Sequence, residues 1–393
     1  MKIALASAFL EDEIYGQKLD DVFMKNVICE EDHFYHRIAK SLSLKNFQPT
    51  VYYMSEEKHR KEFTHKYGHK IIRIPVKKIP FLHESIIISN AIIDEIKKNN
   101  EICYIVSGYY VKYKIPDMFD YMIFKLNGKI PIIARYAGGN HKWLVPIRKS
   151  IKKKALRKCD KIVCSSTNEI EILEQKFNIA RQKIEHMYNP IDTTQFRPRS
   201  ISEVQGKIEF DKNKKYILYV GRLIHNHGIE LVLETFKKIN QKYSNLNLIL
   251  IGDGPMYDEI KQFINQNNLV KSVEMKGRLS HEIICFYYNI SSILFHVGPS
   301  GGVPNVIMEA ITSGLPVIAN DNSPGNKDLI NEINGTGILI KSNDKFELEK
   351  AILKILNTKN EIELLNTEAI TKFSIDKYGE KMNKIIQEIY EEK

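Results

Sequence analysis

The stretch that decides the fold runs from Gly298 to Ala319 and reads GPSGGVPNVIMEAITSGLPVIA. An apolar run typical of a buried strand, Ile293–His296, precedes it, and a second such run, Pro316–Ala319, closes it. Between them, Pro304 stands where a helix over Asn305–Ser313 would begin, and a glycine and a proline follow where it would end. The stretch therefore predicts a strand–helix–strand unit, from which parallel sheets covered on both faces are built.

The same alternation extends outward in both directions. The strands predicted in the second half are Tyr216–Val220, Leu246–Ile251, Val273–Lys276, Ile293–His296, Pro316–Ala319 and Gly337–Ile340. Those predicted in the first half are Lys2–Ser7, Thr50–Met54, Ile71–Ile74, Tyr104–Ser107, Ile132–Arg135 and Lys161–Ser165. Prolines and charges between residues 189 and 215 break the pattern. The sequence thus predicts an α/β protein with two Rossmann-like, doubly wound domains, 1–195 and 196–372, facing each other across a cleft. A closing helix over 373–393 is expected to pack back on the first domain.

Bulk composition narrows the class of protein. The chain has 393 residues, 43% of them hydrophobic, and no apolar run approaches the roughly 20 residues that span a bilayer. The N-terminus reads directly into a strand rather than a signal peptide, and the five scattered cysteines suit a reducing compartment and show no paired metal spacing. We therefore expect a cytoplasmic protein. The net charge of +10 favours anionic partners, such as nucleotides, phospholipid headgroups or nucleic acid, without choosing among them.

Two loops that directly follow predicted strands are candidates for a ligand site, because ligands bind beyond the carboxyl ends of parallel strands. In Gly221-Arg222-Leu223, the glycine lets backbone approach a ligand and the arginine offers a fork of donors for phosphate oxygens. A tight turn with a surface arginine is the alternative. In Gly252-Asp253-Gly254-Pro255, a sharp strand-to-helix turn is the favoured interpretation.

A third loop, within the opening stretch, has the features of an anion site. Backbone N–H groups and the positive end of the helix dipole meet around Gly302–Asn305. About one turn further, the carboxylate of Glu309 could accept two hydrogen bonds from a ribose diol. A solvated or capping glutamate is the alternative.

These loops, in this order, resemble the C-terminal domain of the retaining glycosyltransferases of family four, which have the GT-B fold of two Rossmann-like domains. The similar segments are 221–223, 252–255, 273–278, 300–310 and 314–319, and further upstream 159–166, 188–192 and 196–198. The similarity covers roughly Arg157 to Asp376. The first 150 residues are similar mainly in their strand–helix pattern.

The resemblance implies a metal-independent, retaining hexosyltransferase with no cofactor. It would move a sugar from a nucleotide-diphosphate sugar to a glycan or lipid-linked acceptor in the synthesis of surface polysaccharide, glycoprotein or glycolipid. It implies that Arg222 binds the diphosphate, that Glu309 binds the ribose and that the backbone around Arg278 reads the base. The catalytic candidates are Arg222, His227 and Glu309. The donor-binding candidates are Gly221, Gly254, Gly277, Arg278, Gly301, Gly302, Val303, Pro304, Asn305 and Glu309.

The chain departs from the family's pattern at four places. His227 stands where a lysine usually supplies a second phosphate cation, and Gly301 stands where a glutamate usually lies beside the donor sugar. Ala137 replaces a histidine common at the end of a strand, with His141 a candidate substitute, and the first loop, 7–16, lacks the usual double glycine. These changes leave open a non-catalytic, nucleotide-sugar-binding subunit or partner of a glycosyltransferase complex. A glycogen-type or sugar-phosphate-forming transferase of the same fold is a further alternative.

Basic side chains crowd the segment Arg148–Lys161. If the segment is helical, Ile147, Ile151 and Ala155 form its buried stripe and most of its cations face outward. One interpretation is a solvated helix face. The other is docking on an anionic membrane surface, at about 1 kcal/mol per basic side chain, which would place the protein peripherally on the inner face of the membrane. Nucleic-acid binding is not expected, because no recognised module or aromatic platform accompanies the charge.

Overall fold

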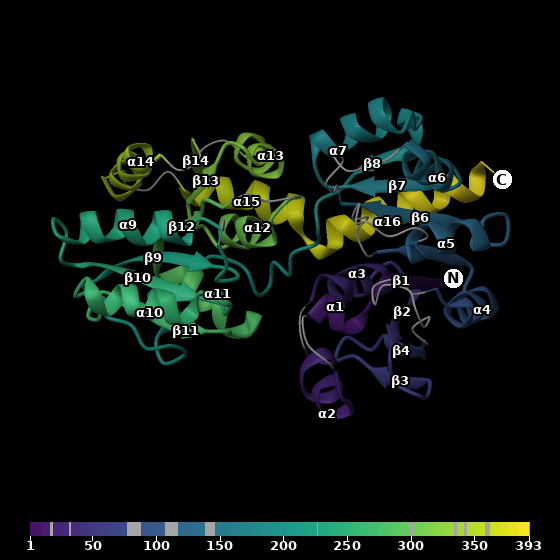
Figure 1. Ribbon diagram of the computed structural model, residues 1–393, viewed down its shortest axis with the longest axis horizontal. Helices are drawn as coiled ribbons and strands as arrows, with labels where there is room; N and C mark the ends of the chain where they lie inside the picture. Colours follow the sequence, from purple (N-terminus) through teal and green to yellow (C-terminus); the bar gives the residue numbers. More distant parts are fainter. Residues whose placement is uncertain are drawn as a thin grey trace. The chain divides into compact units, whose positions relative to one another are not determined.

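The computed structural model forms two compact units, of which unit 1 comprises residues 1–190 with 375–393, and unit 2 residues 191–374 (Figure 1). The structure describes residues 1–15, 19–30, 33–76, 88–106, 117–137, 146–225, 227–298, 302–333, 336–341, 344–357 and 362–392. The domain boundaries that the sequence predicts, after residues 195 and 372, remain predictions.

Unit 1 is built on an eight-stranded sheet with the order β3-β4-β2-β1-β5-β6-β7-β8. Its strands are β1 (Lys2–Leu10), β2 (Gln48–Ser55), β3 (Lys61–Thr64), β4 (Lys70–Pro75), β5 (Ile102–Ile105), β6 (Ile132–Tyr136), β7 (Lys161–Cys164) and β8 (Ile184–His186). The strands pair in parallel, except that β3 runs antiparallel to β4. Parallel pairing requires crossovers, and the helices that supply them cover both faces of the sheet.

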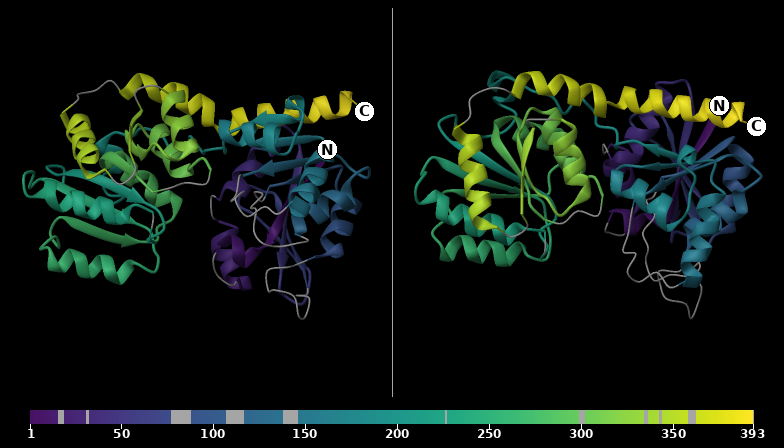
Figure 2. Two further views of the ribbon diagram at one scale, coloured as in Figure 1. Left: turned by 45° about the horizontal axis from the view of Figure 1, so that its top comes forward. Right: turned by 90° about the horizontal axis from the view of Figure 1, so that it is seen from above.

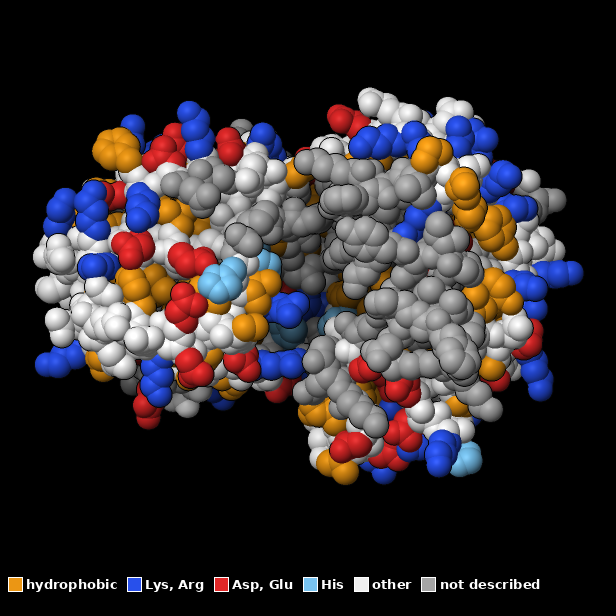
Figure 3. Space-filling model, in the orientation of Figure 1, with side chains coloured by type: hydrophobic (Ala, Val, Ile, Leu, Met, Phe, Trp, Pro, Cys, Tyr) orange, Lys and Arg blue, Asp and Glu red, His pale blue; other side chains and the backbone are white. Residues whose placement is uncertain are grey.

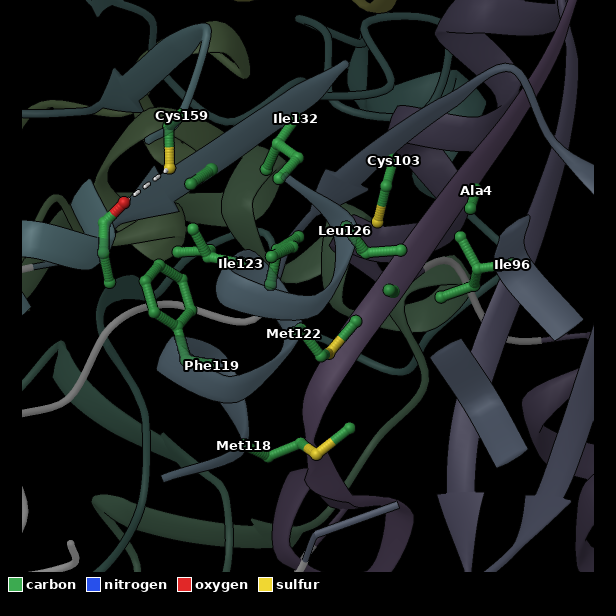
Figure 4. Close-up of a cluster of buried hydrophobic side chains, with 14 of the residues drawn as sticks. Ala4, Ile96, Cys103, Met118, Phe119, Met122, Ile123, Leu126, Ile132 and Cys159 are labelled. Carbon is green, nitrogen blue, oxygen red and sulfur yellow. Dashed lines mark hydrogen bonds between the residues drawn. The ribbon is translucent and has the colours of Figure 1, made fainter. Parts of the chain in front are cut away.

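The helices of unit 1 enclose two hydrophobic clusters. They are α1 (Glu11–Tyr15), α2 (Asp21–Phe23), α3 (Phe34–Ser43), α4 (Asn90–Asn99), α5 (Met118–Leu126), α6 (Pro146–Arg157), α7 (Thr167–Glu171) and α16 (Ile375–Glu391). One cluster joins α4, α5 and α6 to the sheet, and Figure 4 shows Met122 and Leu126 of α5 in it with Cys103 and Ile132 of the strands. The other joins α3 and α16 to the sheet, so the C-terminal helix belongs to the core of unit 1 (Figure 2).

Unit 2 is built on a six-stranded, all-parallel sheet with the order β11-β10-β9-β12-β13-β14. Its strands are β9 (Lys215–Val220), β10 (Leu246–Ile251), β11 (Val273–Gly277), β12 (Ser291–His296), β13 (Val317–Asn320) and β14 (Gly337–Ile340). Its helices are α8 (Ile201–Val204), α9 (Ile229–Asn240), α10 (Tyr257–Gln266), α11 (His281–Ile290), α12 (Asn305–Thr312), α13 (Pro324–Glu332), α14 (Lys345–Asn357) and α15 (Ile362–Phe373). The chain adds strands on one side of β9 as far as β11 and then on its other side from β12 onward. In doubly wound sheets, ligand-binding crevices form where the strand order reverses in this way.

The twelve strands predicted from the sequence all occur, so the predicted alternation is confirmed. Two further strands, β3 and β8, were not predicted. In β3 the residues read Lys-Glu-Phe-Thr, and only its alternate side chains are partly buried, so it lacks an apolar run. The strand β8 has three residues and one buried side chain, which is too short for a periodic signal.

The helix α6 differs from its predicted orientation. Ala155 is buried as expected, but Ile147 is 73% exposed, whereas Arg148 and Lys152 are buried. The Lys152 ammonium donates to carboxylates of Asp117 and Asp120 at the start of α5. The buried face of α6 therefore carries an ion-paired lysine, whereas Ile147 faces the solvent. Hydrophobic periodicity cannot predict this orientation, because it treats every lysine as a surface residue.

No helix in the described part of the chain is both long enough and apolar enough to cross a bilayer.

Candidate functional site

The loops after β9 and β10 pack against each other backbone to backbone. Leu223 N–H donates to the carbonyl of Asp253 at 3.0 Å, and Gly221 N–H donates to that of Ile251 at 3.0 Å. A Cβ at Gly252, whose φ is 138°, would overlap the Gly221 carbonyl, and one at Gly254 would overlap the Leu223 carbonyl. Only glycine fits these positions. This packing explains why both positions of the Gly-Asp-Gly-Pro loop are glycine. Donor binding by Gly254 stays a prediction.

The loop after β9 also packs against the end of β12. Gly228 has a φ of 81° and precedes α9, and a Cβ there would lie 2.8 Å from Val297 Cγ2. A Cβ at Gly298 would overlap the His227 carbonyl. The buried Asn320 amide donates to the carbonyls of Val297 and Gly298, which fixes the end of β12. The three loops therefore form one glycine-packed surface at the carboxyl edge of the sheet.

The N-terminus of α12 lies on the same edge. Pro304 occupies the position before the helix and has no side-chain oxygen that could accept its first N–H groups. A Cβ at Gly325, at the start of α13, would overlap the Gly302 carbonyl, so the backbone leading into α12 packs directly against the start of α13. This end of α12 can therefore receive an anion.

Glu309, one turn into α12, is 2% exposed and is not a solvated glutamate. The hydroxyl of Tyr288 on α11 donates to Glu309 Oε2 at 3.1 Å, and His281 Nε2 lies 3.8 Å from Oε1. The Phe196 ring packs edge-on against both Tyr288 and His281, with ring centroids 5.9 and 6.0 Å apart. The carboxylate is thus held in a fixed orientation. The sequence offered no signal for Tyr288, because it lies within an apolar helical stretch.

Two histidines at this site, His227 and His296, have lowered pKa values. Burial lowers the pKa of the half-buried His227, and the nearby Arg222 guanidinium lowers it further against the opposing charge of Glu230. His227 is therefore neutral at pH 7. Burial also lowers the pKa of His296, at the end of β12, to about 4, with His227 contributing. A bound diphosphate would favour the protonated form of His227, because an opposite charge nearby stabilises it.

The described donor-site candidates lie at or after the carboxyl ends of β9 to β12 or on α12, with Gly277 the last residue of β11. Arg222 and Arg278 are both exposed there. Gly301 and His141 lie outside the described residues. Among the described residues, the cluster close enough to share a metal ion lies elsewhere, at His36, His65 and His69 of unit 1, and the sequence analysis missed it.

Comparison with protein families identifies the class to which the fold and the site belong. Residues 33–195 match Glycosyltransferase Family 4, and residues 200–372 match Glycosyl transferases group 1. The chain belongs to the group 1, family 4 glycosyltransferases, as its sequence motifs predicted.

Two curated relatives are similar over part of the chain. An uncharacterized glycosyltransferase of Haemophilus influenzae is 29% identical over 60% of this chain and 61% of its own length. A Campylobacter jejuni enzyme, named as an N-acetylgalactosaminyltransferase acting on an N-acetylgalactosamine-N,N'-diacetylbacillosaminyl-diphospho-undecaprenol, is 25% identical over 50% of this chain and 52% of its own length. The alignments thus span less than two thirds of these relatives.

Solved structures share the fold over the whole chain. Sucrose-phosphate synthase of Thermosynechococcus elongatus superimposes with a TM-score of 0.74 at 15% identity, covering all of both chains. The Anabaena HepE protein in complex with UDP gives a TM-score of 0.69 at 13% identity, covering 99% of this chain and all of that one. The predicted fold of two Rossmann-like units is therefore confirmed.

Proposed function

We propose that this protein transfers a hexose-type sugar from a nucleotide-diphosphate sugar to a glycan or lipid-linked acceptor, with retention of anomeric configuration. The observation that carries the proposal is the carboxyl edge of the unit 2 sheet. There, glycine-packed loops, the exposed Arg222, the N-terminus of α12 and the buried Glu309 follow successive strand ends. Family membership and the UDP complex of a protein with the same fold support it.

The roles of the residues follow from their chemistry. Arg222 and the first N–H groups of α12 neutralise the diphosphate and stabilise it as it leaves the sugar. His227, neutral when the site is empty, donates one hydrogen bond and gains charge as the phosphates approach. Glu309, with one oxygen held by Tyr288, orients the ribose and with it the donor sugar.

The acceptor is proposed to be lipid-linked, because the Campylobacter relative is named for an undecaprenol-linked acceptor. Lys149, Lys154 and Arg157 on α6 and Lys158 directly after it are exposed, and so is Ile147 at the start of the helix. Figure 3 shows basic side chains near this part of unit 1. Exposed cations on a helix that also exposes an apolar side chain suit an anionic lipid surface, and the proposal includes binding at the cytoplasmic face of a membrane.

A second candidate function is nucleotide-sugar binding without transfer. His227 and Gly301 favour it, because both stand where the family's pattern has a charged residue. Transfer or donor hydrolysis by the purified chain alone would exclude this candidate.

The experiment is a panel of UDP-, GDP- and ADP-sugars, assayed for binding by calorimetry and for turnover with lipid-linked acceptors. One donor should bind and turn over. Arg222→Ala should weaken its binding about 10- to 100-fold, since a charge-assisted hydrogen bond contributes about 1.5–3 kcal/mol. Lys261→Ala, an exposed cation on α10, is the matched control and should bind as the wild type does. Unchanged affinity in Arg222→Ala would remove this residue from the site, and no binding of any donor would refute the proposal.

A further inference from the structure

The hairpin that joins β3 to β4 places two histidines opposite each other. His65 N–H donates to the His69 carbonyl at 3.0 Å, and Gly68 N–H donates to the His65 carbonyl at 2.8 Å. Gly68 has a φ of 84°, as the left-handed position of a three-residue hairpin loop requires. The two imidazoles consequently lie on one face of the hairpin and stack with their centroids 4.6 Å apart.

A third histidine reaches this pair from α3. The ring of His36 stacks on that of His65 with centroids 4.1 Å apart, and His36 Nδ1 lies 3.0 Å from His69 Nε2. All three side chains are buried, at 0%, 1% and 4% exposure for His36, His65 and His69. One ring nitrogen from each residue lies within 4.8 Å of the other two.

Imidazole nitrogens are common metal ligands, and this buried cluster offers three of them from two elements, the β3–β4 hairpin and α3.

Hydrogen bonds do not account for all the nitrogens of this cluster. His36 and His69 share one hydrogen bond, and their outer nitrogens, His36 Nε2 and His69 Nδ1, are buried with no partner among the described residues. Buried polar atoms in native proteins nearly always have a protein, water or ion partner. An ion held by the facing nitrogens, His36 Nδ1 and His69 Nε2, would replace their hydrogen bond, and the outer nitrogens would take partners of their own, such as water.

We propose that His36, His65 and His69 form a binding site for one transition-metal ion, with Zn²⁺ the first candidate. Imidazole suits Zn²⁺, Cu²⁺ and Ni²⁺, whereas Ca²⁺ and Mg²⁺ prefer oxygen ligands. Bonds of 2.0–2.1 Å at a tetrahedral angle put ligand nitrogens about 3.4 Å apart. The His36 and His69 nitrogens lie 3.0 Å apart and the third nitrogen lies within 4.8 Å of both, so the rings would turn out of their parallel stack to aim all three lone pairs at one ion.

The ion would have a route and a structural role. His69 lines a cavity of about 470 Å³ at the edge of the sheet, together with Gly68 and Lys70. Since β3 is the last strand of the sheet, coordination would tie this edge hairpin to α3. The site belongs to unit 1, and it neither requires nor supplies any step of the proposed sugar transfer.

The test is Zn²⁺ titration of untagged, chelator-treated protein, with bound metal counted by mass spectrometry. We expect one ion per chain and a rise in melting temperature that the chelator reverses. His69→Gln and His36→Gln should each weaken Zn²⁺ binding at least 100-fold. His59→Gln, an exposed histidine of the same unit, is the control and should bind like the wild type. Equal affinity in His69→Gln, or no saturable binding by the wild type, would overturn the proposal.

A measurement on the unchanged chain covers the case in which the variants fail to fold. Co²⁺ replaces Zn²⁺ and reports its own coordination through its visible ligand-field bands. The proposal expects the intense bands of a four-coordinate, nitrogen-ligated ion at one equivalent. The weak bands of a six-coordinate, largely hydrated ion would identify an adventitious surface site and contradict the proposal.

Discussion

His296 shows how a single residue can link the donor site to stability. The residue as a whole is partly exposed, but the ring atom Nε2 is buried without a partner among the described residues, and burial lowers the pKa of His296 to about 4. In the unfolded chain the pKa is about 6.5, so below that pH the unfolded state binds a proton that the folded state does not. Unit 2 should therefore lose stability as the pH falls, by up to about 2 kcal/mol from this residue between pH 7 and pH 5.

Urea unfolding of the wild type and of His296→Gln at both pH values isolates this contribution, because the variant has no titrating group at the position. The wild type should lose more stability than the variant on acidification. Parallel loss in the two proteins would show that the pKa of His296 is not depressed.

At the scale of elements, the helix α6 shows what periodicity can and cannot predict. If this segment is helical, its sequence places Ile147 on the buried stripe and most of the cations outward. The helix is present, but Ile147 is exposed and Arg148 and Lys152 are buried. Lys152 is buried because Asp117 and Asp120, about 30 residues earlier in the chain, supply its counter-charges. Such a partner is visible only after α5 and α6 have packed together.

The exposed cations of α6, together with Lys158 directly after it, lead to a prediction about membrane binding. Reversing Lys149, Lys154 and Lys158 to Glu should weaken binding to anionic vesicles at least about 100-fold, since each basic side chain near the surface contributes about 1 kcal/mol. Co-sedimentation with phosphatidylglycerol vesicles measures the effect, which should shrink as salt is added. The matched control reverses Lys98, Lys125 and Lys129, which are exposed elsewhere on unit 1. If both triple variants lose binding equally, net charge rather than α6 is responsible.

At the scale of the whole molecule, the sequence predicted most of the fold and the outline of one site. Most of the parallel strands contain a short apolar run, and the loops with glycine, proline and arginine follow directly in the chain, so both could be recognised from neighbouring residues alone. The histidine cluster could not be predicted in this way, since His36 lies on a helix about 30 residues before the hairpin. The contact of Tyr288 with Glu309 likewise depends on the packing of α11 against α12.

The C-terminal helix makes the stability of unit 1 depend on the last residues of the chain. Gly379 of α16 sits against α3, and a Cβ there would lie 2.5 Å from the Ser41 carbonyl and 3.1 Å from Lys45 Cγ. The nearest neighbour is backbone, which cannot move aside without shifting α3. Alanine favours an isolated helix over glycine by about 1 kcal/mol, whereas overpacking costs about 1–3 kcal/mol. Gly379→Ala should therefore destabilise unit 1 by up to about 2 kcal/mol.

Denaturant unfolding measures that change, and donor affinity separates it from damage to the site. The affinity should stay at the wild-type value, because the donor loops belong to residues 191–374. Gln387→Ala, an exposed position on the same helix, should leave stability within about 0.5 kcal/mol. A more stable Gly379→Ala would mean that helix propensity outweighs the close approach of α16 to α3. In that case the glycine would not be needed for the C-terminal helix to close the core of unit 1.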